Sequence, residues 1–137
     1  SEGFYDVQQP GEQPTWNNRG VFITGSDGRY WFTGIKPVPY PIPDDGPVGQ
    51  MLTLLGRHPW RPAHMHFMLN HSRYERIVTH TFVSGDPYLI SDAVFGVKDS
   101  LIIDYLPCSE EGVMWKASFD FFMVEKAAKR NTERTNT

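Results

Sequence analysis

The sequence has only one cysteine among its 137 residues, Cys108, so it cannot close an internal disulfide or supply a cysteine-rich zinc site. It also has no run of about 18 apolar residues, which a membrane-crossing helix would need. The net charge is −3, and no basic stripe is available to follow the phosphates of a nucleic acid. These absences predict a cytoplasmic protein that binds neither membranes nor nucleic acids, with Cys108 in a structural role.

Long helical patterns are missing as well, whereas aromatic residues reach 14% and the 12 glycines and 11 prolines are frequent. This composition predicts an all-β domain, an antiparallel sandwich or barrel. A short helix or a few turns around residues 48–55, ended by Gly56, is the exception. The expected strands are residues 21–24 and 29–33, joined as a hairpin by Asp27-Gly28, and residues 63–69, 76–83, 101–105 and 114–124.

The length favours a single domain, expected over residues 1–125 and followed by a polar tail, residues 126–137. Within the domain, residues 36–43 contain four prolines, which exclude a helix and a central strand. This segment should be extended and stiff. Tyr40 and Ile42 should project to the same side, because alternate residues of an extended chain share a face.

Histidines and arginines gather between Arg57 and Phe67, where three of the five histidines of the chain lie. His64 and His66 are two residues apart on an expected strand, so their side chains should point to the same face. Two imidazoles on one face can share a metal ion. The same spacing also occurs in strands whose histidines are simply exposed or hydrogen-bonded, so the pair alone does not decide between these interpretations.

Two kinds of additional metal ligand are available. His80, on the next expected strand, would complete a three-histidine zinc or copper site. Tyr5 and Tyr40 would instead supply phenolate oxygens, which are hard anionic donors and suit Fe(III). For either tyrosine the plain alternative is a packed ring with a satisfied hydroxyl group. The residues by themselves do not decide between these two kinds of metal site.

Longer stretches of the sequence resemble a known family. Residues 39–49 (PYPIPDDGPVG) and 55–67 (LGRHPWRPAHMHF) closely resemble the intradiol ring-cleavage dioxygenases, for which the Arg-Pro-Ala-His-x-His core with an upstream tyrosine is highly specific. Residues 79–83 (THTFV) and 91–101 (SDAVFGVKDSL) are most similar to the hydroxyquinol 1,2-dioxygenase branch. The resemblance extends to about residue 124 and implies the β-sandwich of that family.

The resemblance also implies a cofactor, one non-haem Fe(III) per chain, held by Tyr5, Tyr40, His64 and His66. In that family the tyrosine matched by Tyr40 leaves the metal when the diol binds, which places a base close to the substrate hydroxyl group. Arg61 matches an arginine whose positive charge stabilises negative charge on the substrate ring.

Further residues of the implied site lie against the substrate. Ile42, Pro43 and Val94 fall where the hydroxyquinol branch has apolar walls, which a flat aromatic ring needs. His80 stands where catechol enzymes tend to have a glutamine. It is expected to take part in catalysis beside the substrate or Arg61, rather than as a metal ligand.

The implied reaction is cleavage of an aromatic ring by O2 between two hydroxylated carbons. The expected partners are O2 and a small aromatic diol or triol. Benzene-1,2,4-triol (hydroxyquinol) would give 3-hydroxy-cis,cis-muconate, which is equivalent to maleylacetate. One alternative is a catechol or chlorocatechol 1,2-dioxygenase. An alternative from another class is a truncated, non-catalytic metal-binding β-domain.

The chain departs from the family pattern at its start. Hydroxyquinol and catechol enzymes usually carry a longer N-terminal part, which includes a helical dimerisation segment and the first strands, whereas this sequence starts just before Tyr5. We therefore expect a fragment, or a domain that another segment completes, and a homodimer in the full-length form.

Overall fold

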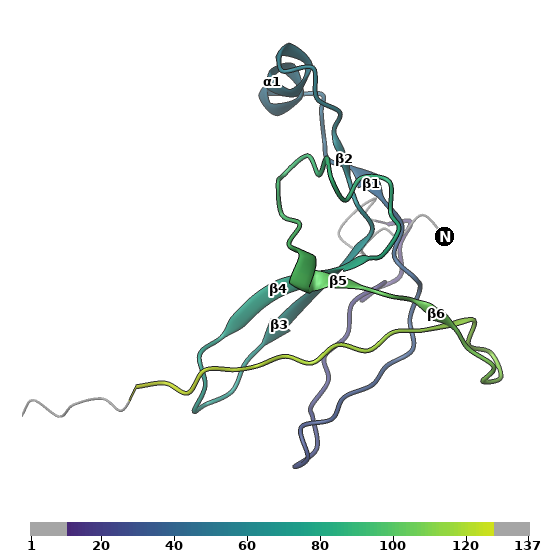
Figure 1. Cartoon of the computed structure of the whole chain (residues 1–137), viewed down its shortest axis with the longest axis vertical. Coiled ribbons are helices and arrows are strands. Elements are labelled where there is room, and N and C mark those ends of the chain that lie inside the picture. Colours follow the sequence, from purple (N-terminus) through teal and green to yellow (C-terminus); the bar gives the residue numbers. More distant parts are fainter. Residues whose placement is uncertain (1–10, 128–137) are drawn as a thin grey trace, which may run out of the picture.

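The computed structural model describes residues 11–127, so the expected ligand Tyr5 and all but two residues of the expected tail lie outside the described residues. Short strands predominate in this part of the chain (Figure 1), which confirms the all-β class. No helix within residues 11–127 is long and apolar enough to cross a membrane. The elements are β1 (Tyr40–Pro41), α1 (Pro47–Leu54), β2 (Trp60–Arg61), β3 (His64–Leu69), β4 (Ile77–Val83), the 3-10 helix η1 (Asp99–Leu101), β5 (Ile102–Ile103), β6 (Leu106–Pro107) and β7 (Trp115–Lys116).

The antiparallel hairpin β3–β4 is the centre of the fold and confirms the two strands predicted at residues 63–69 and 76–83. Its register places His66 opposite His80 and His64 opposite Phe82. The β-branched and aromatic residues of β4 suit a pleated, half-buried strand. On the other side of β4 the short strand β5 pairs in parallel, with Ile102 opposite Phe82, whereas antiparallel pairing was expected throughout.

The two faces of this sheet differ in chemistry because successive side chains of a strand alternate between faces. One face carries the histidines of β3 and β4 around Phe82, which is completely buried. The other face carries Phe67, whose ring lies 6.4 Å from the rings of Tyr30 and Phe32 and 4.8 Å from that of Phe121. Aromatic packing on one face thus supports a polar, histidine-rich face on the other.

Helix α1 confirms the helical turns predicted around residues 48–55 and ends at the predicted glycine. Gly56 adopts a left-handed conformation (φ 63°) and donates its N–H to the carbonyl of Thr53, while Arg57 donates to the carbonyl of Leu52. This pair of bonds is a Schellman motif, which stops a helix and reverses the chain. It directs Arg57 and the residues after it towards β2.

The proline-rich segment is extended, as predicted, and pairs only briefly. β1 and β2 are antiparallel, with Tyr40 opposite Arg61, and Ile42 donates its N–H to the carbonyl of Pro59 (2.9 Å). Tyr40 and Ile42 are half-buried while Pro41 is exposed, which fits the prediction that the first two share a side. Because proline has no N–H to donate, the pairing cannot extend into a wider sheet.

The hairpin predicted over residues 21–33 forms only at its turn. Gly28 is left-handed (φ 74°) and donates its N–H to the carbonyl of Gly25 (3.0 Å). No strand forms over residues 21–33, all of which the structure describes. Side chains of the first arm are exposed, Ile23 to 96%, whereas Tyr30 and Phe32 of the second arm are half-buried. The first arm therefore has no buried face to fix its register.

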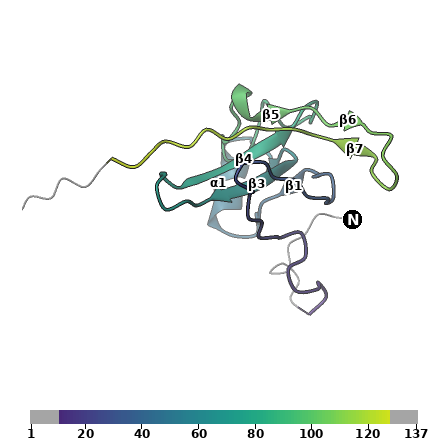
Figure 2. The same ribbon diagram turned by 90° about the horizontal axis from the view of Figure 1, so that it is seen from below.

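The predicted strand at residues 101–105 is confirmed over β5, and the one at residues 114–124 only over β7. Beyond β7 the chain stays extended and passes across the hairpin β3–β4 (Figures 1 and 2). It is joined there by the N–H of Glu75, which donates to the carbonyl of Val124 (2.7 Å). Side-chain packing, more than a hydrogen-bonded ladder, therefore holds this segment.

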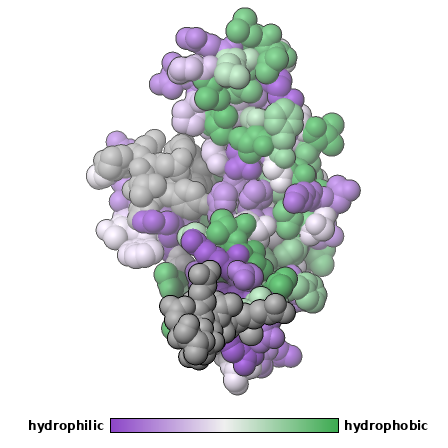
Figure 3. All heavy atoms as spheres, turned by 90° about the vertical axis from the view of Figure 1, so that its left-hand side faces the viewer, coloured by the Kyte–Doolittle hydropathy of each residue, from purple (hydrophilic) through white to green (hydrophobic). Residues whose placement is uncertain are grey.

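Exposed apolar side chains gather on α1, at the top of the molecule in Figure 3, where hydrophobic residues are green. Val48, Met51, Leu54 and Leu55 are each more than half exposed. The inner side of the helix is fixed by Leu52 and Gly49, which are both buried.

Gly49→Ala should destabilise the protein, although alanine in a helix is ordinarily better than glycine by about 1 kcal/mol. A Cβ at this position would overlap the main-chain carbonyl group of Asp44. We expect a loss of about 1–3 kcal/mol, as for other overpacked sites, measured as a lower urea midpoint. The matched control is Gly34→Ala, whose Cβ would meet only Phe32 at 3.9 Å. A Gly49→Ala protein as stable as wild type would contradict the packing described.

Candidate functional site

Three histidines meet on one face of the sheet. The ring centroid of His64 lies 4.9 Å from that of His66 and 5.6 Å from that of His80, and the rings of His66 and His80 are 5.3 Å apart. The first two come from β3 and the third from the facing position on β4. The alternation of β3 therefore brings the predicted histidine pair to one side, as the sequence indicated.

Tyr40 lies at the edge of this face. Its ring centroid is 5.4 Å from that of His64, because the pairing of β1 with β2 sets Tyr40 opposite Arg61, three residues before His64. The structure thus brings together three of the four predicted metal ligands, Tyr40, His64 and His66. Two imidazoles and a phenol form a donor set that fits a hard, highly charged transition metal ion.

The hydrogen bonds of His64 define its tautomer. Its Nδ1 lies 2.7 Å from the carbonyl oxygen of Pro62, which can only accept, so Nδ1 carries the hydrogen. Nε2 is then left with its lone pair, and it accepts from Nη1 of Arg61 at 3.1 Å. A metal ion would bind through this same lone pair, so metal binding would replace the hydrogen bond from Arg61.

All three imidazoles favour the neutral form. Burial, reinforced by the charge of Arg61, lowers the pKa of His64 to about 4, although the Pro62 carbonyl acts in the opposite direction. Burial also lowers the pKa of His66 and of His80, and the nearby positive charges add to the effect. Neutral imidazole is the form that binds metal ions, so at pH 7 these rings need not lose a proton first.

Histidines alone do not build a metal site here. Within residues 11–127 no three His, Cys, Asp or Glu side chains are arranged so that they could hold a metal ion. The three-histidine zinc or copper site is therefore unsupported. Nε2 of His80 is instead buried without a hydrogen-bond partner, and a Cβ built on Gly96 would lie 3.2 Å from it. A tyrosine oxygen is the remaining type of donor at hand.

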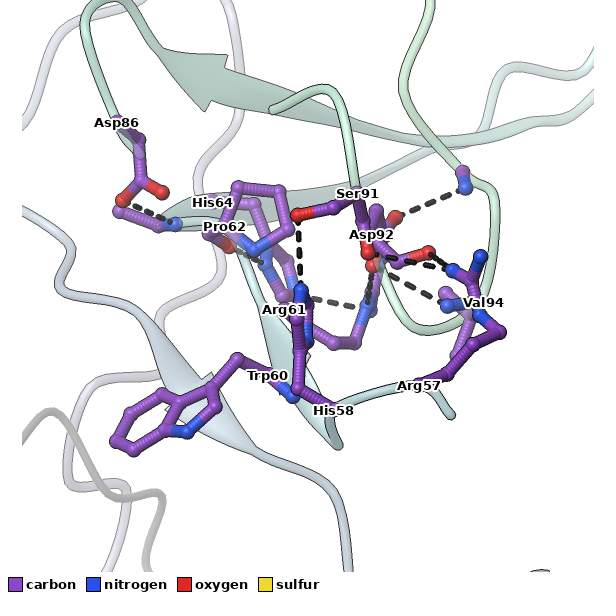
Figure 4. A network of polar contacts seen from close by, with 12 residues as sticks. Arg57, His58, Trp60, Arg61, Pro62, His64, Asp86, Ser91, Asp92 and Val94 are labelled. Atoms are coloured by element: carbon purple, nitrogen blue, oxygen red, sulfur yellow. Dashed lines mark hydrogen bonds and ion pairs between the residues drawn. The ribbon is translucent and has the colours of Figure 1, made fainter. Parts of the chain in front are cut away.

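Arg61 is the buried charge of the site (Figure 4). Its side chain is 8% exposed, and it donates from Nε to Oδ1 of Asp92 at 3.1 Å and from Nη2 to Oδ2 at 3.5 Å. Nη1 is directed towards His64. The guanidinium group thus bridges the loop that carries Asp92 and the histidine face.

Asp92 accepts hydrogen bonds from the main chain as well as from Arg61. The N–H of Gly96 donates to Oδ2 at 2.8 Å and the N–H of Val94 to Oδ1 at 3.3 Å. Burial by itself would raise the pKa of Asp92, but the bonds from Arg61, Gly96 and Val94 outweigh it and lower the pKa. The carboxylate is therefore charged whenever the protein is folded at neutral pH.

The loop of residues 84–98, which contains Asp92, is also tied by other bonds to the segment that leads into β2 (Figure 4). Arg57 donates to the carbonyls of Ser91 (3.3 Å) and Asp92 (3.0 Å). His58 accepts the N–H of Trp60 at Nδ1 (3.1 Å), so its Nε2 carries the hydrogen and donates to Ser91 Oγ (2.8 Å). In this tautomer His58 cannot serve Ser91 as a base. His58 therefore links this loop to the segment before β2.

The three residues predicted as apolar walls are half-buried or exposed. Ile42 is half-buried beside Tyr40, whereas Pro43 is exposed and Val94 is 46% exposed. Two hollows of the described part, of about 510 and 420 Å³, contain none of the predicted site residues. They lie along the extended C-terminal segment, and the first is lined by Ile102 and Lys116 among others.

Sequence reasoning assigned no role to Asp92, Arg57 or Gly96. A signal for the first was present, because an arginine among apolar residues and prolines is expected to be buried and a buried guanidinium needs an acidic partner. Several carboxylates could have filled this place, and the pattern of the sequence did not choose between them.

The stability of the metal-free protein should fall between pH 6.5 and pH 4.5. The unfolded chain binds protons at histidines of ordinary pKa, near 6.5, while folded His64 has a pKa of about 4, so the unfolded state takes up more protons as the pH falls. Urea midpoints measured across this range test the slope. His64→Gln should flatten it, and His71→Gln, at an exposed position, should not. Equal slopes in the two variants would refute the assignment.

Comparison with known proteins identifies the family of the chain. Residues 1–125 match the family model described as Dioxygenase. The chain is 52% identical over 133 residues to the hydroxyquinol 1,2-dioxygenase of Rhizobium sp. (strain MTP-10005), which covers 90% of this chain and 45% of the relative. It is 50% identical over 123 residues to the 6-chlorohydroxyquinol 1,2-dioxygenase of Cupriavidus pinatubonensis, covering 90% and 44%. The chain thus spans about half the length of the curated relatives it matches.

Solved structures agree with these relatives. The hydroxyquinol 1,2-dioxygenase from Pseudomonas putida DLL-E4 superposes with a TM-score of 0.82 and 44% identity, over 91% of this chain and 47% of that one. Catechol 1,2-dioxygenase from Acinetobacter sp. ADP1 gives a TM-score of 0.84 and 32% identity, over 91% and 44%. With the histidine pair, the tyrosine and the buried arginine in place, the chain belongs to the intradiol ring-cleavage dioxygenase family.

Proposed function

We propose that this chain carries the metal site of an enzyme that cleaves a dihydroxylated aromatic ring with O2 between its two hydroxylated carbons, and that benzene-1,2,4-triol is the substrate. The observation that carries the proposal is the grouping of Tyr40, His64 and His66 with Arg61 directly beside His64. The names of relatives at about 50% identity support the hydroxyquinol assignment.

The cofactor proposed is one non-haem Fe(III) per chain. Tyr40, His64 and His66 would hold it, and Tyr5, which lies outside the described residues, is proposed as the fourth ligand on the resemblance alone. When bound, the ion would supply the Lewis acidity that makes a chelated diol reactive towards O2.

The residues of the chain have distinct tasks in this proposal. The phenolate oxygen of Tyr40, at the edge of the histidine face, accepts a proton from a substrate hydroxyl group. The guanidinium group of Arg61 stabilises the negative charge that then resides on the ring, and burial strengthens this effect because little water screens it. His80 lies beside His64 and His66 on β4 and shapes the surface next to Arg61.

The substrate would lie against apolar side chains. Ile42 is kept beside Tyr40 by its hydrogen bond to Pro59, and Pro43 continues that stiff segment. Val94 is presented by the same loop that carries Asp92. We keep these three as walls for a flat aromatic ring. We also propose residues 1–125 as the catalytic domain with a polar tail after it, and a homodimer for the full-length form.

Catechol or chlorocatechol cleavage is the second candidate, favoured by the TM-score of 0.84 with a catechol 1,2-dioxygenase. A metal-binding domain without catalytic activity of its own is the third candidate. Its supporting observation is that the chain covers less than half of its curated relatives.

The visible spectrum tests the ligand set. Protein loaded with Fe(III) should be coloured by charge transfer from tyrosinate, and Tyr40→Phe should bleach or shift the band because it removes one phenolate. Tyr74→Phe is the matched control, since Tyr74 lies at the far end of the hairpin, where its main chain forms an isolated β-bridge with Glu125. A colourless protein with a full complement of iron would contradict phenolate ligation.

Substrate preference tests the proposed subtype. Oxygen uptake by the iron-loaded chain should be faster with benzene-1,2,4-triol than with catechol at equal concentration, by about 10-fold or more in kcat/KM, which is the size of discrimination a few hydrogen bonds can give. A clear preference for catechol would assign the chain to the second candidate instead, and no turnover of either would favour the third.

A further inference from the structure

We propose that Asp92 is a positioning residue, which sets the direction in which Arg61 presents its charge to the histidine face. The inference rests on the proposed function, because Arg61 acts there on the substrate. Asp92 does not itself face the proposed metal ligands. We call the 91–96 segment, which holds the Asp92 carboxylate, the clamp.

The carboxylate of Asp92 has little freedom. It is 3% exposed, and each oxygen is engaged by one main-chain N–H and one nitrogen of Arg61. The N–H of Gly96, at 2.8 Å, is the shortest of these bonds. Because the main chain holds both oxygens, the carboxylate cannot rotate to follow the arginine, and the arginine must conform to it.

The direction of Arg61 follows from this arrangement. Nε and Nη2 are directed to the two oxygens of Asp92, and in the planar guanidinium group the position of two nitrogens determines that of the third. Nη1 is the nitrogen left over, and it lies 3.1 Å from Nε2 of His64. A lysine, or an arginine without this partner, would have no such fixed orientation.

The conformation of the backbone after Asp92 also helps to hold its carboxylate. Phe95 has a left-handed conformation (φ 56°), which is unfavourable for an aromatic residue, and the residue is 76% exposed. The conformation turns the N–H of Gly96 back towards Asp92. At Gly96 a Cβ would lie 3.2 Å from side-chain atoms of Arg61, Asp92 and His80, so a larger residue would crowd all three.

The loop also has ties that do not involve the Asp92 side chain. Arg57 donates to the main-chain carbonyl of Asp92, and Ala93 donates its N–H to the carbonyl of Trp60 in β2 (3.1 Å). Asp86 provides a comparison within the same loop: its carboxylate accepts the N–H groups of Ala63 and Tyr88, both at 2.9 Å, and no arginine. If Asp92 had only a structural role, replacing Asp92 or Asp86 should have the same effect on Arg61.

The first test uses the metal-free chain, so that its outcome does not depend on activity. The Nε–H signal of Arg61, assigned by its loss in Arg61→Lys, is followed by hydrogen exchange in 15N-labelled protein at pH 7. Asp92→Asn should speed this exchange about 10-fold or more relative to the amides of β3 and β4, while Asp86→Asn should leave the ratio within about 2-fold. An unchanged ratio in Asp92→Asn, or an equal rise in both variants, would overturn the proposal.

The second test is a double-mutant cycle in the iron-loaded protein. Asp92→Asn should lower kcat about 10-fold or more with a smaller change in KM, and should lower it less than about 2-fold when Arg61 is already lysine, because its effect passes through Arg61. Asp86→Asn should act equally in both backgrounds. Fully multiplicative losses for Asp92→Asn would overturn the proposal. An inactive wild-type chain whose Arg61 exchange still depends on Asp92 would refute the proposed function and leave the clamp intact.

Discussion

A guanidinium group that is almost fully buried needs a fixed anionic partner, because an unpaired charge in the protein interior costs several kcal/mol. Arg61 meets this constraint through Asp92, and much of the local structure follows from it. The turn at Phe95, the absence of a side chain at Gly96 and the ties from Arg57 all lie around this one ion pair. The fold thus presents a positive charge to a group of neutral histidines without leaving that charge to solvent.

The hairpin β3–β4 makes this arrangement possible because its two faces carry different kinds of side chain. Phe67 packs against aromatic rings from distant segments, while His64 and His66 occupy the opposite face two residues apart. A shift of one residue in register would exchange the faces and bury the histidines among phenylalanines. Aromatic packing therefore protects the chemistry of the site as much as it contributes to stability.

The sequence predicted those parts of the structure that depend on short-range patterns. The alternation of β3, the helix ended by Gly56 and the stiff segment around Tyr40 all came from residues close together in the chain. The arms of the hairpin at residues 21–33 were predicted from the same kind of pattern and did not form, because the first arm has β-rich composition but no buried face to specify its pairing. Asp92 could not be chosen as the partner of Arg61, since 31 residues separate them and only the tertiary structure brings them together.

That separation has a consequence for the order of folding. Closing an unstructured loop of about 30 residues costs about 3 kcal/mol of chain entropy, before any contact repays it. Arg61 precedes β3 and Asp92 follows β4, so formation of the hairpin brings the two close and removes most of this cost. We therefore expect the local hairpin to form before the ion pair, which then closes on a sheet that already exists. On this route the orientation of Arg61 is set after the hairpin and not together with it.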